Sequence, residues 1–81
     1  MTTKQIQIMT TVIRGNADGS FMDLDQVLEC LQYKTTKQSI QFSIRALISK
    51  GALSKKPREN RRGRSRVVIS PTRDGYAAMQ G

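Results

Sequence analysis

Apolar residues recur along the first fifty positions with the spacing of three helices. The three apolar stripes are Ile6, Met9 and Ile13; Leu24, Val27, Leu28 and Leu31; and Ile40, Ile44, Leu47 and Ile48. Residues three or four positions apart lie on one face of a helix, so each stripe marks a face that can be buried. We therefore predict helices at about 3–15, 23–32 and 36–50.

Each predicted helix begins near a candidate capping box, in which a short polar residue is followed three positions later by glutamine. The pairs are Thr2 with Gln5, Asp23 with Gln26, and Thr35 with Gln38. In this motif each side chain bonds the backbone N–H of the other residue. Gly15 and Gly51 follow the first and third stripes, where glycine commonly ends a helix.

The second half of the chain changes to extended segments that predict an antiparallel hairpin at about 52–70. We expect a strand at 53–56, a turn at 57–63 and a β-branched return strand at 65–70. Residues 20–22 are consistent with a brief third strand. Residues 71–75 interrupt the pattern, and we expect one last helical turn at 76–79. The chain of 81 residues then forms one α+β domain over 1–81.

Basic residues are concentrated at the tip of the predicted hairpin. Positions 55–66 hold seven of the fourteen lysines and arginines and one acid, Glu59. Such a run repels itself and requires water or a polyanion around it. The run is preceded by Leu53 and followed by Val67, Val68 and Ile69, which favour burial. We therefore predict a presented surface loop and not a loose basic tail.

The net charge of +8 is divided unevenly between the two halves. Residues 1–33 hold two bases and four acids, whereas residues 34–81 hold twelve bases and two acids. The sequence pI of about 10.4 favours nucleic acid as a partner, ahead of an anionic membrane. We expect the polyanion to meet the second half.

The composition argues against an enzyme and against a metal or cofactor site. The chain has no histidine, a single cysteine, Cys30, and no glycine-rich phosphate loop. We expect Cys30 to be an inert packing residue and predict no small-molecule ligand. No apolar run approaches the length of a membrane span, and the N-terminus lacks a signal-peptide pattern, so we expect a cytoplasmic protein.

The order of these elements resembles winged helix-turn-helix proteins, which have three helices and a wing of two or three strands. The segment from Thr35 to Leu53 has the apolar spacing of their recognition helix and closes with Lys50-Gly51-Ala52-Leu53. The stretch from Arg64 to Gly75 resembles the end of the wing in MarR-type regulators. The resemblance covers roughly residues 5 to 76.

This resemblance implies binding to double-stranded DNA, with helix 36–50 in the major groove and the wing on the backbone or minor groove. The matching positions of the recognition helix are Lys37, Gln38, Gln41 and Arg45. The matching basic positions of the wing are Lys55, Lys56, Arg58, Arg61, Arg62, Arg64 and Arg66. We expect a transcriptional regulator, in the first instance a repressor, that is nucleoid-associated if the source is a bacterium or a phage. Small phage- or plasmid-encoded regulators often have this size and composition.

Phe42 departs from the family pattern, because an aromatic residue stands in the middle of the reading face. It is suited to gripping another protein, to touching a thymine methyl, or to packing against Tyr33 or the first helix. Two other functions therefore stay open. One is an accessory corepressor that clamps DNA with its wing while it docks on another DNA-bound repressor or on a second copy of itself. The other is an RNA-binding winged helix.

Overall fold

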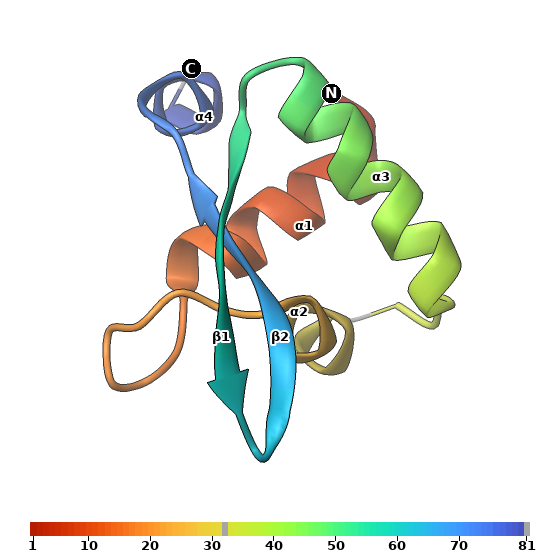
Figure 1. The fold of residues 1–81 in the computed structure, drawn as a ribbon. Helices are drawn as coiled ribbons and strands as arrows, with labels where there is room; N and C mark the ends of the chain where they lie inside the picture. The colour runs from red at the N-terminus through yellow and green to blue at the C-terminus, as the bar shows by residue number, and fades with distance from the viewer. Residues whose placement is uncertain (32, 81) are drawn as a thin grey trace.

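The computed structural model describes residues 1–31 and 33–80, which form an α+β fold (Figure 1). Its elements are α1 (Thr3–Arg14), α2 (Leu24–Cys30), α3 (Lys37–Ser49), β1 (Leu53–Arg61), β2 (Arg64–Pro71) and α4 (Arg73–Gln80). The three predicted helices are confirmed, each with slightly narrower bounds. The predicted end of the second helix, residue 32, lies outside the described residues. The hairpin of β1 and β2 is antiparallel.

The apolar faces of the three helices meet in one core, but the first predicted stripe was wrong in part, because Ile6 is 43% exposed and Ile8 is buried beside Met9. Ile8, Met9 and Val12 of α1 pack with Val27 of α2, with Ile40, Ile44 and Leu47 of α3, and with Leu53 and Ile69 of the hairpin; all are buried. Partly buried residues such as Leu24, Ile48 and Val67 pack around this cluster. Helices and hairpin therefore share a single hydrophobic centre, which fixes the hairpin relative to α3.

Side-chain caps define the helix starts, and two of the three predicted capping boxes are confirmed. Thr2 with Gln5 and Asp23 with Gln26 make both reciprocal bonds. The third prediction was wrong, because Thr36 caps α3 by accepting a hydrogen bond from Ser39 N at 3.1 Å. Thr36 immediately precedes the first helical residue, so its hydroxyl reaches the free N–H groups of the first turn and that of Thr35 does not.

The C-terminus of α3 closes where the predicted glycine stands. Gly51 has a φ of +82° and donates to Ile48 O, while Ala52 N donates to Leu47 O. These two bonds form a Schellman motif, which satisfies the last carbonyls of the helix and directs the chain into β1.

The hairpin is longer than the sequence predicts, and the expected seven-residue turn at 57–63 was wrong. The strands extend to a two-residue turn at Arg62 and Gly63, both with positive φ. A positive φ at both central residues matches the twist of a tight hairpin. The register shifts between Lys56 and Glu59, because Pro57 has no N–H for the ladder and a bulge accommodates it.

The loop before α2 adds a short contact to the hairpin. Asp23 bridges Val68 in antiparallel fashion, and Ile69 N donates to Met22 O at 3.0 Å. This is one bridge and not a full third strand. It nevertheless attaches the start of α2 to β2.

The C-terminal helix was underestimated, since eight residues and not one turn are helical. Gly75 reads as a helix breaker in the sequence, but it lies buried inside α4. A Cβ atom there would stand 2.1 Å from Ala52 O, so glycine permits α4 to pack directly on the backbone after α3. The Thr72 hydroxyl, which accepts from Gly75 N at 3.0 Å, begins the helix.

Candidate nucleic-acid interface

The exposed side of α3 carries polar residues opposite its buried stripe. Gln38, Gln41 and Arg45 are exposed, and so is Lys37 at the first helical position. Their position follows from the core, because burial of Ile40, Ile44 and Leu47 turns the remaining side of the helix toward solvent. All four residues expected to contact DNA from this helix are accessible.

Phe42 lies on the same exposed side. It is 76% exposed, the largest value among the exposed large apolar residues. The interpretation that it packs against Tyr33 or the first helix is therefore wrong. The buried residues of α3 lie on the side of the helix opposite Phe42, so this ring cannot reach the core.

Arg61 does not point to solvent as expected for a phosphate-binding residue. Its guanidinium donates to Phe21 O at 2.8 Å, to Gln26 Oε1 at 3.1 Å and to Glu59 Oε2 at 2.7 Å. It also lies 3.7 Å from the Asp23 carboxylate, which is only 5% exposed. Arg61 is thus a partly buried link between the hairpin tip and the start of α2.

Asp25 joins three elements through a single carboxylate. One oxygen lies 3.1 Å from Lys37 Nζ at the start of α3, and the other pairs with the Arg66 guanidinium of β2. The side chain of Arg66 is 19% exposed, while that of Lys37 is 52% exposed. Asp25 therefore holds Arg66 inward, whereas Lys37 keeps access to solvent.

The remaining hairpin cations face outward. Lys55, Lys56, Arg58 and Arg64 are exposed, and within residues 1–31 and 33–80 none of them has an ion pair. Arg62 lies 3.7 Å from Glu29, with both side chains open to water. An exposed pair of this kind contributes little and is easily exchanged for another anion.

Two adjoining hollows run between α3 and the hairpin, with volumes of about 240 and 130 Å³. Both are lined by Leu24, Gln41, Arg58 and Val67. The larger one adds Arg45 of α3 and Lys55 of β1, over a floor of Ile44, Ile48 and Ile69. Together they form a groove with an apolar floor and a basic rim, and we call it the α3–hairpin groove.

The strand pleat separates two neighbouring lysines. Lys55 borders the α3–hairpin groove, whereas Lys56 lies on the opposite face, with its Nζ 5.9 Å from the centre of the Phe21 ring. Successive residues of a strand point to opposite faces. Only one face of the hairpin therefore adds its cations to the exposed side of α3.

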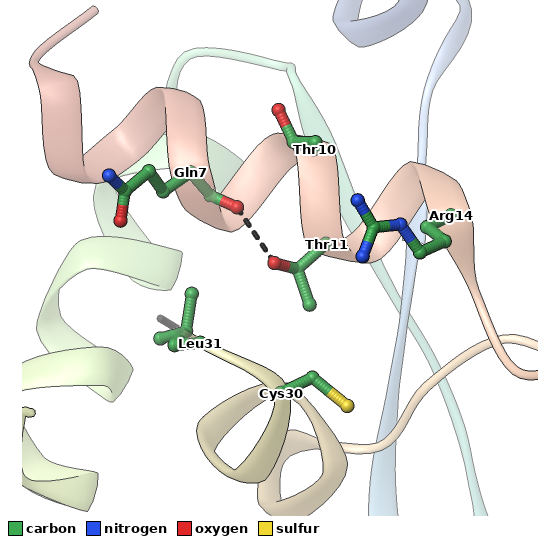
Figure 2. A pocket seen from close by; sticks show the side chains of 6 residues that line it. All are labelled: Gln7, Thr10, Thr11, Arg14, Cys30 and Leu31. Atoms are coloured by element: carbon green, nitrogen blue, oxygen red, sulfur yellow. Dashed lines mark hydrogen bonds between the residues drawn. The ribbon is translucent and has the colours of Figure 1, made fainter. Parts of the chain in front are cut away.

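A separate hollow of about 100 Å³ lies between α1 and the end of α2, away from the hairpin (Figure 2). Cys30 lies there with Thr11 and Arg14, and the Thr11 hydroxyl donates to Gln7 O at 2.9 Å. Cys30 is exposed, so the expectation of a packing residue was wrong. Cys30 is the last residue of α2, and its thiol lies outside the buried face of the helix.

Asp18 and Tyr33 have shifted pKa values. Hydrogen bonds from the Ser20 side chain and backbone lower the pKa of Asp18 below its usual range. Burial raises the pKa of Tyr33. Neither group lies on the α3–hairpin groove, so these pKa shifts do not change the charge of the groove.

In the part of the chain that the structure describes, no three histidine, cysteine, aspartate or glutamate residues gather into a metal-binding group. Over the same residues, no helix combines the length and the apolar character needed to cross a bilayer.

The sequence did not predict that carboxylates near the start of α2 pair with arginines of the hairpin. Asp23 and Asp25 read as residues favoured at a helix N-terminus, and Asp23 does cap α2. The available signal was the contrast between an acidic segment at 18–29 and a basic segment at 55–66. That contrast indicates attraction between the segments, but it does not say which arginine pairs with which acid.

Comparison with models of known protein families and with curated protein sequences finds no match to this chain. The likeness to winged helix-turn-helix proteins therefore stays a prediction, supported by the order and spacing of the elements.

Proposed function

We propose that this chain is a transcriptional regulator of the winged helix-turn-helix type that binds double-stranded DNA, with α3 in the major groove. The observation that carries the proposal is the α3–hairpin groove. There the exposed Gln41 and Arg45 of α3 and the exposed Lys55 and Arg58 of β1 border one surface. A helix fits the major groove, and a basic hairpin beside it meets the adjoining phosphates.

The two sides of the groove have different tasks in this proposal. Amide side chains such as Gln38 and Gln41 pair with an adenine edge, and Arg45 pairs with guanine or with a phosphate. Lys55 and Arg58 neutralise phosphates, which adds affinity without sequence information. The hairpin therefore supplies most of the affinity, and α3 supplies the preference for a site. We propose a repressor, which would act by occupying its operator.

The proposal is tested by fluorescence anisotropy with random duplex DNA and with duplex RNA of the same length. We expect the protein to bind DNA more tightly than RNA. Raising the salt from about 50 to about 200 mM should weaken binding at least tenfold, because bound phosphates release counterions. Binding to RNA as tight as to DNA, or no binding to DNA at low salt, would reject the proposal.

The reading role of α3 needs a separate measurement. Selection from a random DNA library should return a preferred site for the intact protein. Gln38→Ala or Arg45→Ala should then relax the preference at one position, with a loss of about 1–3 kcal/mol for that site. Arg73→Ala, which removes an exposed cation from α4, is the matched control and should leave the selected site unchanged.

The exposure of Phe42 favours a second candidate function, an accessory corepressor that docks on another DNA-bound regulator. In that case the protein alone would bind duplexes without site preference. A partner repressor, added to the same library, would produce a discrete footprint that Phe42→Ala abolishes. A preferred site found with the protein alone decides for the first candidate.

A further inference from the structure

We propose that Phe42 is a specificity-determining residue that contacts the 5-methyl group of thymine in the major groove. This inference rests on the proposed function, since it requires α3 to enter duplex DNA. In this inference the aromatic ring on the exposed side of α3 contacts a DNA base and not a protein partner.

Phe42 occupies the outermost line of α3. It stands two positions from both Ile40 and Ile44, which are buried, and two residues turn a helix by about 200°. With 76% of its surface exposed, the ring projects from the side of α3 opposite the core. This is the line of a helix that reaches deepest into a groove.

The surroundings of Phe42 on α3 favour a small apolar target. Its neighbours one turn away are Gln38, Ser39, Arg45 and Ala46, which are polar or small. A protein-docking surface needs a contiguous apolar patch, and α3 offers one isolated ring amid hydrogen-bonding groups. The apolar residues of the α3–hairpin groove lie on its floor, on the flank of α3 toward the hairpin.

The thymine methyl has the properties that this position requires. It is the apolar group that base pairs present in the major groove, next to the acceptors and donors that Gln and Arg recognise. A contact with Phe42 would therefore fit between the polar contacts of Gln38 and Arg45. The Thr36 cap and the Gly51 closure hold α3 at both ends, so the ring is carried on a fixed backbone.

The test removes and restores the methyl group in the site selected from random duplex DNA. Each thymine is replaced in turn by deoxyuridine, which lacks the methyl and keeps the same pairing edge. We expect one substitution to weaken binding about fourfold, the effect of one buried methyl group. In a second pair of sites, that position carries cytosine or 5-methylcytosine. The site with 5-methylcytosine should bind more tightly, because it restores the methyl group. Phe42→Ala should bind thymine and deoxyuridine sites equally.

The control variant is Ser49→Ala, which changes another exposed residue of α3 and should keep the full difference between thymine and deoxyuridine. Circular dichroism confirms that each variant is folded, as expected for changes at exposed positions. A selected site without thymine, or equal binding of thymine and deoxyuridine by the intact protein, overturns the inference while the DNA-binding proposal stands. Absence of DNA binding overturns both.

Discussion

Four cations of the hairpin form two groups that differ in what they face. Arg61 and Arg66 turn toward α2 and are held by Asp23, Glu59 and Asp25. Lys55 and Arg58 turn toward α3 and, within the described residues, have no acidic partner. One basic segment thus contains both the residues that attach it to the fold and the residues that are available to a ligand.

This division of the cations explains how a segment of such charge density remains ordered without a polyanion. Self-repulsion of the tip is offset by the acids of α2 and by the hydrogen bonds of Arg61 to Phe21 O and Gln26. Glu59, the one acid of the segment, pairs with Arg61 on the same strand. The inward group positions the hairpin, and the outward group keeps its charge for binding.

The largest expected effect comes from removing Arg61, which belongs to the inward group. Arg61→Ala should lower the free energy of unfolding by about 2–3 kcal/mol, since it removes the cation beside the buried Asp23 carboxylate and the hydrogen bonds to Phe21 O and Gln26 Oε1. Arg64→Ala, at an exposed position near the same turn, should change it by less than about 0.5 kcal/mol. Chemical denaturation measures both. Equal stability of the two variants would remove the distinction between the groups.

The outward group is tested by the two neighbouring lysines of β1. Lys55→Ala should weaken binding to duplex DNA about fivefold, because one phosphate contact at the groove is lost. Lys56→Ala removes the same charge from the opposite face and should cost less than about twofold. Anisotropy titrations of both variants at one salt concentration make the comparison. A greater loss with Lys56→Ala would place DNA on the other face.

Asp25 lies at the boundary between the groups, and its removal should have opposite effects on folding and binding. Asp25→Asn leaves Arg66 and Lys37 without their carboxylate, which should reduce stability by about 1 kcal/mol. DNA binding should tighten about threefold, because two cations beside the groove lose an internal competitor. Thermal denaturation and anisotropy on the same sample measure the pair of effects. Weaker DNA binding at unchanged stability would contradict this role.

The smallest expected effect concerns Asp18, which lies in the loop before α2 and lines the same hollow as Arg61 at the end of β1. Hydrogen bonds from the Ser20 hydroxyl and then its backbone lower the pKa of Asp18, and the charge of Arg61 adds least. A carboxyl whose pKa is lowered by folding stabilises the fold above its unfolded value of about 3.9. That stabilisation is lost as the pH falls through the folded pKa.

An NMR titration distinguishes these causes. Ser20→Ala should move the pKa of Asp18 furthest toward its usual value, because it removes the hydroxyl bond and keeps the backbone bond, whereas Arg61→Ala should move the pKa only slightly. A larger shift with Arg61→Ala would mean that Asp18 belongs to the inward charge network.

The sequence predicts those parts of the fold that depend on local periodicity. Helices form where apolar residues recur within a few positions, as in the stripes that end at Ile13, Leu31 and Ile48. The end of α3 follows in the same way from the glycine at position 51. The turn and the last helix depend on contacts from elsewhere. The strand continues through Pro57 because a bulge absorbs the missing N–H, and Gly75 stays helical because Ala52 O lies against it.

The candidate site was predictable to the same extent. Helical spacing is sufficient to expose Gln38, Gln41 and Arg45 on one side of α3. The orientation of each hairpin arginine is not a local property, since Arg61 and Arg66 are turned inward by carboxylates more than thirty positions away. For that reason seven basic residues look equivalent in the sequence and are not equivalent in the structure.

The most direct test of the central claim is the salt dependence of duplex binding for Arg58→Ala beside Arg61→Ala. Each phosphate contact contributes about 0.9 to the slope of log K against log salt concentration. We expect Arg58→Ala to reduce that slope by about one, and folded Arg61→Ala to keep the slope of the intact protein. A reduction of the slope by about one with Arg61→Ala, and no reduction with Arg58→Ala, would contradict the division between inward and outward cations.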